Sequence, residues 1–211
     1  QKISRCCFRR WLPMGERATL TNMAVECGGF TGIVEPDEVT VEFLVRMRGL
    51  SPDEVRRHIV RADPDAQYAH SFEVDISALR PMVALPGDPK NGVPIDQLKD
   101  EVKIDIAYGG SCTGGKMEDM DLYARVLSRA DALGLKVAPG VRLFLQFGSQ
   151  RIKEYARGRG YLDLFARVGA TLVDPSCGAC IRAGPGTSES ADQVTVSAQN
   201  RNFPGRSGPG P

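Results

Sequence analysis

The stretch VRLFLQFGSQRIKEYARGRGYLDLFARVGATLVDP, residues 141–175, has the pattern of a strand, a helix and a second strand. Its first eight residues form a short apolar run, and the next segment is helix-periodic with a glycine interruption. The closing ATLVDP reads as another short strand. Strand–helix–strand connections of this length are right-handed in nearly all proteins and join parallel strands. The stretch therefore predicts a parallel α/β sheet.

The residues just upstream repeat this alternation. VKIDIAYG, residues 102–109, reads as a β-rich run, and KMEDMDLYARVLSRADALG, residues 116–134, is helix-periodic. Four apolar residues are expected near one face of that helix: Met120, Leu122, Val126 and Leu127. Residues 73–98 look like a strand followed by a Pro/Gly-rich crossing segment at a domain boundary. The predicted fold is thus a parallel-sheet α/β/α domain over residues 73–211.

A second region precedes this domain. In PDEVTVEFLVRMRG, residues 36–49, acids follow a proline at a helix start, and the final glycine ends the helix. In SPDEVRRHIVRA, residues 51–62, the serine is the expected N-cap and the proline occupies the first helical position. Residues 16–72 thus form a separate region with solvated helices at the edge of a domain. Residues 1–15 form an atypical leader, whose Cys6 and Cys7 receive no role.

Composition narrows the classes of function. The 211 residues carry a net charge of +1, with 42% hydrophobic and 25% charged residues, as in ordinary soluble domains. This charge gives no support for nucleic acid as a partner. No stretch approaches the roughly 18 apolar residues of a membrane span, and the N-terminus lacks the apolar run of a secretory signal. With six unevenly spaced cysteines in such a chain, we expect a reduced, cytoplasmic setting.

Three cysteines follow predicted strands. Cys112 lies after the strand at 102–108, and Cys177 and Cys180 follow the strand at 170–173. Ligands of open parallel sheets bind beyond the carboxyl ends of the strands. The three thiols are therefore expected at the same edge of the sheet.

Three kinds of site use such thiols. A zinc site would normally offer four ligands, and neither histidine of the chain lies in this region. A thioredoxin-like redox pair would stand at the start of a helix, whereas the sequence after Cys180 runs into helix breakers. Three thiolates with an open fourth position suit an iron–sulfur cluster whose free iron acts as a Lewis acid. The third alternative is favoured.

A segment near the C-terminus carries two positive charges that could bind an anionic substrate. The segment SAQNRNFPGRSG, residues 197–208, contains two arginines, Arg201 and Arg206, together with two asparagines. Arginine is the natural bidentate partner of a carboxylate. A di- or tricarboxylate beside a Lewis-acid iron is a coherent substrate class.

Four motifs then identify a family. GGSCTGGKMEDM, DPSCGACI, NRNFPGRSGPG and ERATLTNMAVECGG resemble the aconitase superfamily, which includes aconitase, homoaconitase and the large subunit of 3-isopropylmalate dehydratase. The resemblance runs from about Glu16 to Gly210 and implies that residues 16–72 are the tail of a second α/β domain, followed by an incomplete third domain over residues 73–211. It implies a hydro-lyase that isomerises a hydroxy di- or tricarboxylic acid by dehydration and rehydration. The dehydratase branch, which serves leucine biosynthesis, is preferred.

The resemblance also implies roles for residues. A [4Fe–4S] cluster would be held by Cys112, Cys177 and Cys180. Catalytic roles near the cluster and its bound water pass to Asn22 and Glu26. Substrate binding passes to three residues of the last loop: Asn200, Arg201 and Arg206.

Two departures and a gap qualify the match. Gly114 replaces the usual asparagine after S-C-T, so a polar contact near Cys112 is lost or supplied elsewhere, and C-G-A-C is closer to aconitase than to the dehydratase. The chain matches the middle of a family member, so we expect an incomplete enzyme, inactive alone, that needs a small swivel-domain subunit or a missing C-terminal domain. Aconitate hydratase or homoaconitase activity is the alternative, and an inactive or RNA-binding fragment is the alternative of another class.

Several conspicuous residues have ordinary structural explanations. Cys27 is expected to be a small buried hydrophobic residue. His58 and His70 fall on charged stretches and are expected to be solvated. GSQR, residues 148–151, is expected to be a plain strand–helix turn rather than an anion site.

Overall fold

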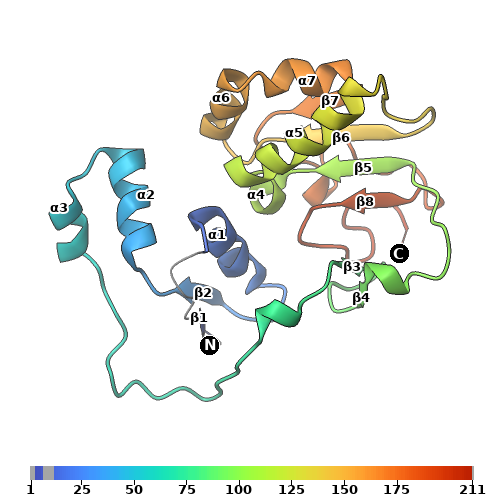
Figure 1. Ribbon diagram of the computed structural model, residues 1–211. Coiled ribbons are helices and arrows are strands. Elements are labelled where there is room, and N and C mark those ends of the chain that lie inside the picture. The colour runs from blue at the N-terminus through green and yellow to red at the C-terminus, as the bar shows by residue number, and fades with distance from the viewer. Residues whose placement is uncertain (1–2, 7–11, 211) are drawn as a thin grey trace. The chain divides into compact units, whose positions relative to one another are not determined.

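In the computed structural model, which describes residues 3–6 and 12–210, a parallel sheet forms the centre of the C-terminal part of the chain (Figure 1). Its strands are β5 (Ile106–Gly109), β6 (Arg142–Gln146), β7 (Ala170–Val173) and β8 (Thr195–Ser197). They lie in the order β7-β6-β5-β8, and every pairing is parallel. The predicted parallel α/β fold is confirmed, and β8 is an additional strand.

Helices cover one side of this sheet. α5 (Met117–Ala132), α6 (Gln150–Gly158) and α7 (Tyr161–Arg167) lie together there in Figure 1. The larger core forms between them and β6 and includes Met120, Leu145 and Phe165. Because side chains alternate along a strand, Phe144 points to the other side, where it packs with Tyr108 in a smaller core.

The buried face of α5 differs from the predicted one. Met120 and Ala124 are buried, with Tyr123 and Leu127 packed beside them, as the i, i+3, i+4 spacing of a helix face requires. Leu122 and Val126 are instead 46% and 65% exposed. Two of the four predicted residues were therefore placed on the wrong face, because an apolar side chain is not always an inward one.

The connection from β6 into α6 and α7 follows the predicted pattern. The Ser149 hydroxyl accepts a hydrogen bond from the Ile152 N–H at 3.3 Å and caps α6, as in a plain strand–helix turn. The glycine interruption falls at Gly160, whose φ of 74° separates α6 from α7.

The prediction of a strand at the start of residues 73–98 was wrong. The Asp75 carboxylate accepts from the Ser77 N–H at 2.9 Å and caps a short 3-10 helix, η1 (Ile76–Ala78), which turns the chain away from extended backbone. An antiparallel pair follows, β3 (Met82–Ala84) with β4 (Gly92–Pro94), and then η2 (Ile95–Gln97).

The chain divides into two compact units, residues 1–80 and 81–211. In the first unit, β1 (Ile3–Cys6), which lies within the segment 1–15, pairs in parallel with β2 (Thr31–Val34), and α1 (Met14–Met23) connects them.

The two predicted N-terminal helices are confirmed. α2 (Glu38–Arg48) begins with a capping box at Asp37 and ends at Gly49, which adopts the left-handed conformation. α3 (Pro52–Arg57) is capped by the Ser51 hydroxyl, which accepts from the Glu54 N–H at 3.1 Å.

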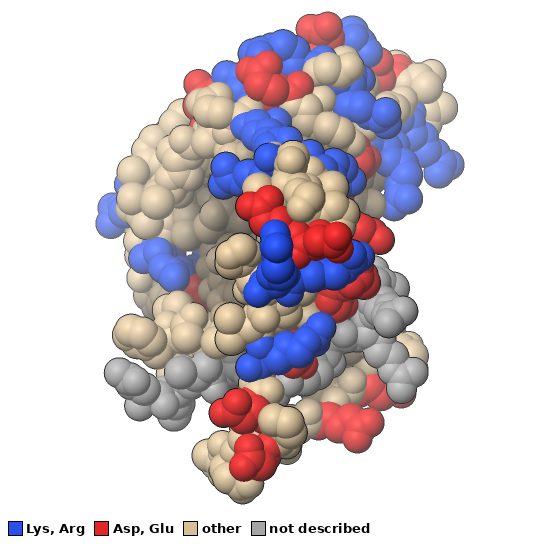
Figure 2. All heavy atoms as spheres, turned by 90° about the vertical axis from the view of Figure 1, so that its left-hand side faces the viewer, with Lys and Arg blue, Asp and Glu red and all other residues tan. Residues whose placement is uncertain are grey.

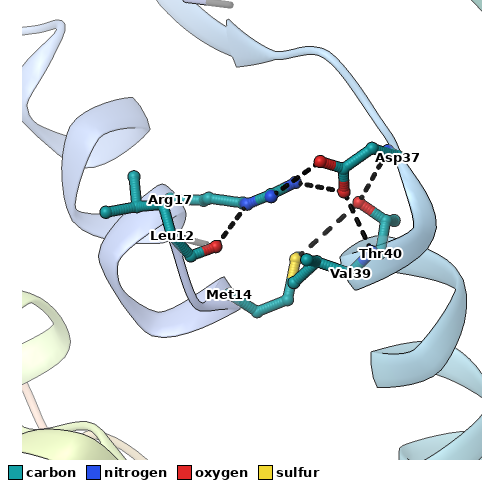
Figure 3. A network of polar contacts seen from close by, with 6 residues as sticks. All are labelled: Leu12, Met14, Arg17, Asp37, Val39 and Thr40. Atoms are coloured by element: carbon teal, nitrogen blue, oxygen red, sulfur yellow. Dashed lines mark hydrogen bonds and ion pairs between the residues drawn. The ribbon is translucent and has the colours of Figure 1, made fainter. Parts of the chain in front are cut away.

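A partly buried ion pair joins the first two helices of this unit (Figure 3). The Arg17 guanidinium, 3% exposed, donates to both Asp37 oxygens at 2.7 and 2.9 Å, and its Nε donates to the Leu12 carbonyl at 2.8 Å. Arg17 lowers the pKa of the Asp37 carboxyl, mainly through this hydrogen bond. Because Asp37 also caps α2, the pair fixes α1 against α2.

Charge is mixed over the visible surface. On the face in Figure 2, Lys and Arg side chains are interspersed with Asp and Glu. Among the described residues, no helix has the length and apolar character needed to cross a membrane.

Candidate functional site

The cysteine loops begin at the carboxyl ends of two strands that flank β6. Cys112 lies in α4 (Ser111–Gly114), directly after β5, and Cys177 lies between β7 and the 3-10 helix η3 (Gly178–Ile181), which contains Cys180. Since β5 and β7 both run parallel to β6, the two loops start at the same edge of the sheet. Cys112 and Cys177 are exposed, and Cys180 is 8% exposed.

Backbone packing fixes the loop with Cys112. Gly110 has φ 123°, and a Cβ on it would lie 2.1 Å from the Gln146 carbonyl oxygen. A Cβ on Gly115 would lie 2.5 Å from the Ser111 carbonyl oxygen and 2.7 Å from that of Gln146. Ser111 itself has φ 77°, an uncommon value for a residue other than glycine. Only glycine fits at positions 110 and 115, so the loop lies directly on the end of β6.

The departure at Gly114 has a steric explanation. A Cβ there would lie 2.8 Å from the Ala198 carbonyl oxygen and 2.9 Å from the Ala198 Cβ, which leaves no room for the asparagine of the family pattern. The Gly114 carbonyl accepts a hydrogen bond from the Tyr123 hydroxyl at 2.8 Å. Burial raises the pKa of Tyr123, so the phenol stays protonated and remains a donor.

Side chains hold the loop with Cys177. The Gln146 amide nitrogen donates to the Ser176 carbonyl and to the Ser176 hydroxyl, both at 2.9 Å. The Tyr108 hydroxyl donates to the Gln146 amide oxygen at 3.0 Å. Neither Gln146 nor Tyr108 was predicted as a site residue, because each shows in the sequence only as a polar group near the end of a predicted strand.

The last loop brings a predicted residue to a cysteine. The Cys180 thiol lies 3.8 Å from the Asn200 amide oxygen and can donate a weak hydrogen bond to it. The Asn202 amide donates to the Leu85 carbonyl at 2.6 Å and ties this loop to the turn between β3 and β4. Arg201 and Arg206 are both partly buried, and within the described part of the chain the Arg206 Nε is buried without a hydrogen-bond partner. An arginine N–H in this state would donate a hydrogen bond to a carboxylate of a ligand.

The three predicted cluster ligands, Cys112, Cys177 and Cys180, do not form a preassembled metal site. Among residues 3–6 and 12–210, no three Cys, His, Asp or Glu side chains stand close enough to hold a metal ion. The four cysteines whose side chains are described form no disulfide with one another; the side chains of Cys6 and Cys7 lie outside that description. Asn22 in α1 and Glu26 in the following turn are half-buried and belong to the first compact unit.

Cys27, His58 and His70 are all exposed. The prediction that Cys27 is buried was wrong: it is exposed, because it lies in the turn after α1, where Ala24 occupies the buried position. His58 and His70 are exposed, as predicted.

Comparison with known proteins gives consistent results. The model of the aconitase family (aconitate hydratase) matches residues 9–103 and 97–211. The chain is 39% identical over 198 residues to the 3-isopropylmalate dehydratase large subunit of Nautilia profundicola, covering 93% of this chain and 45% of that protein. It is 40% identical to large subunit 1 of the same enzyme from Pyrococcus furiosus, covering 93% of this chain and 44% of that protein.

A third relative, the 3-isopropylmalate dehydratase large subunit of Aquifex aeolicus, is 38% identical over 199 residues, with 94% of this chain and 44% of that protein covered. The chain thus spans about half the length of the curated relatives that it matches. The family model, by contrast, covers nearly all of the chain. On these matches and on its parallel α/β sheet, the chain belongs to the aconitase family.

Proposed function

We propose that this chain is the cluster-binding part of a hydro-lyase that dehydrates and rehydrates a hydroxy di- or tricarboxylic acid, most like the large subunit of 3-isopropylmalate dehydratase. The observation that carries the proposal is that the two cysteine loops start at the same edge of a parallel sheet. The last loop approaches the same place through Asn200, which lies beside Cys180. The names of the similar proteins favour the dehydratase over aconitate hydratase or homoaconitase.

Cys112, Cys177 and Cys180 would hold a [4Fe–4S] cluster. Three thiols without disulfides, two of them exposed at the carboxyl edge of the sheet, fit the donor chemistry of such a cluster. Asn200, beside Cys180, adds a polar neighbour to one of these sulfurs. When bound, the cluster would supply an iron without a cysteine ligand, a Lewis acid for oxygen atoms of the substrate.

The residues of this chain then have distinct tasks. Arg201 and Arg206 would bind the substrate carboxylates, and the buried Arg206 Nε supports that role. Glu26 would hold the proton of the leaving or entering water, with Asn22 close to it in the chain. The base that removes the carbon-bound proton is expected from outside this chain.

The expected partner is a small, swivel-domain subunit, since the similar proteins are named as large subunits. The mixed charge in Figure 2 and the net charge of +1 favour a metabolite over nucleic acid. The cytoplasm is the proposed location because free thiols and an iron–sulfur cluster suit a reducing compartment.

The experiment is electron paramagnetic resonance after anaerobic reconstitution with iron and sulfide and mild oxidation. We expect a three-iron signal that Cys112→Ser, Cys177→Ser and Cys180→Ser each abolish. Cys27→Ser is the matched control, because Cys27 is an exposed thiol of the other unit, and it should leave the signal intact. A chain that binds zinc or no metal, or a signal that survives Cys112→Ser, would overturn the proposal and favour an inactive fragment.

A further inference from the structure

Gln146 is a fully buried amide at the end of β6, between the two strands that carry the cysteine loops. Its side chain is 0% exposed. Its nitrogen donates to the Ser176 carbonyl and hydroxyl, both at 2.9 Å, and to the Asp174 carbonyl at 3.3 Å. Its oxygen accepts from the Tyr108 hydroxyl at 3.0 Å. Both ends of the amide are therefore used, which sets its orientation.

The residues beneath the Cys177 loop surround this amide closely. A Cβ on Gly178, whose φ is 51°, would lie 2.9 Å from the Gln146 amide nitrogen and 3.0 Å from the Tyr108 oxygen. The Tyr108 ring is held in turn by Gly186, where a Cβ would lie 2.4 Å from Tyr108 Cε2. Tyr108 and Gln146 thus form a buried polar bridge, which contacts the residues on both sides of Cys177.

The phenol of this bridge stays protonated. Burial raises the pKa of Tyr108, and the hydrogen bond that its oxygen accepts from the Ala179 N–H only partly offsets this rise. Tyr108 therefore keeps donating its proton to the Gln146 oxygen, and the amide nitrogen remains turned toward the loop.

We propose that Gln146, oriented by Tyr108, is a positioning residue for the thiols of Cys177 and Cys180. Ser176 is covalently next to Cys177, so the two hydrogen bonds from Gln146 fix the backbone at the point where the loop leaves the strand. Without them, the Ser176 carbonyl would lose its donor, and the segment through η3 would open locally. The inference rests on the proposed function only in treating these thiols as cluster ligands. The position of the thiols themselves can be measured without metal.

The test is alkylation of the metal-free, reduced chain with iodoacetamide, with the rate at each cysteine read by mass spectrometry of peptides. Gln146→Met keeps the length of the side chain and removes both polar atoms. We expect the rate at Cys180, which is buried, to rise about tenfold, as loss of buried hydrogen bonds allows the loop to open. The rates at Cys112 and Cys27 should change less than twofold, because the main chain of Gln146 still supports the Cys112 loop and Cys27 belongs to the other unit.

Two further variants keep the test decisive. Tyr108→Phe removes the donor that orients Gln146, together with the acceptor of the Ala179 N–H, and should raise the Cys180 rate about threefold, even if Gln146→Met fails to fold. Gln150→Met makes the same chemical change at an exposed position in α6 and should leave every rate unchanged. A Cys180 rate that stays within twofold in both bridge variants, or a parallel rise at Cys112, would overturn the positioning role.

Iron and sulfide content after reconstitution separates this inference from the proposed function. If the positioning role and the cluster are both right, Gln146→Met lowers the iron bound per chain at least threefold relative to Gln150→Met. If the alkylation rate at Cys180 rises in Gln146→Met while neither the wild type nor the variant binds iron, the positioning role stands and the proposed function fails. If the wild-type chain binds iron while Cys180 stays protected in the variant, the positioning role fails alone.

Discussion

The two cysteine loops rest on the same strand end, yet they are held in different ways. Gly110 and Gly115 bring the backbone of the Cys112 loop against the Gln146 carbonyl, in contacts that allow no Cβ. The Cys177 loop is held instead by the Gln146 amide and, through it, by Tyr108. A backbone contact cannot yield, whereas the end of a side chain can move. The same substitution should therefore cost more in the first loop than in the second.

The largest effect is expected for Gly110→Ala. Its Cβ would lie 2.1 Å from a main-chain oxygen, and its φ of 123° is unfavourable for any other residue. We expect a loss of about 4 kcal/mol in the free energy of unfolding, measured by urea titration with circular dichroism.

Gly140→Ala is the control for Gly110→Ala, because Gly140 has φ 83° but no atom within 4 Å of its Cβ position. Its cost should be only about 1 kcal/mol, from the backbone conformation alone. Equal losses in the two variants would show that φ, and not the contact with β6, decides the cost.

Gly114→Asn comes next and restores the residue of the family pattern. The contacts of 2.8 and 2.9 Å with Ala198 are to a main-chain oxygen and a Cβ, so the loop must shift, and we expect a loss of about 2 kcal/mol by the same titration. Gly158→Asn is the control, since Gly158 lies at the end of α6 with open space around its Cβ position. A stabilising Gly114→Asn would mean that the asparagine of the family pattern fits and that the close approach of Ala198 is wrong.

Sequence patterns predict part of the fold but not the contacts that distinguish the two cysteine loops. The strand at 170–173, the glycine that ends α2 and the serine that caps α3 were predicted because short-range chemistry determines them. The positions of the cysteines after strands were equally visible. Gln146 was not, because its role depends on which strands flank β6 in space. Leu122 was misplaced for a related reason, since only the packed structure shows which apolar residues of α5 meet the sheet.

Gly178→Ala tests the second loop and should cost less than either change in the first. The added Cβ would meet the ends of Gln146 and Tyr108 at 2.9 and 3.0 Å, both parts of side chains. These contacts and the φ of 51° should together lower the free energy of unfolding by about 1.5 kcal/mol in the urea titration. In the alkylation experiment, the displaced bridge should also raise the rate at Cys180, whereas Gly140→Ala should not. A loss as large as that of Gly110→Ala would contradict the difference between the loops.

The smallest expected effect concerns pH. The Cys112 loop continues into α5 through Asp119, whose carboxylate accepts from the Lys116 N–H at 2.8 Å, while the bridge under the other loop is neutral. Burial raises the pKa of Asp119 above its ordinary 3.8. The folded chain therefore binds this proton more tightly than the unfolded chain, and the resulting stability is present below 3.8 and lost as pH rises through the higher folded value.

Asp119→Asn keeps the acceptor but cannot ionise. Relative to wild type it should gain about 0.5 kcal/mol in the free energy of unfolding between about pH 3.5 and pH 7, measured by urea titration at each pH. Asp192→Asn is the control of opposite sign, because the Ser190 side chain lowers the pKa of the exposed Asp192, whose contribution is lost as pH falls. If both differences moved in the same direction, the carboxylate at the start of α5 would not be the source of the effect. If the two differences have opposite signs, the attachment of the Cys112 loop to α5 depends on pH. The neutral Gln146–Tyr108 bridge under the Cys177 loop has no such dependence.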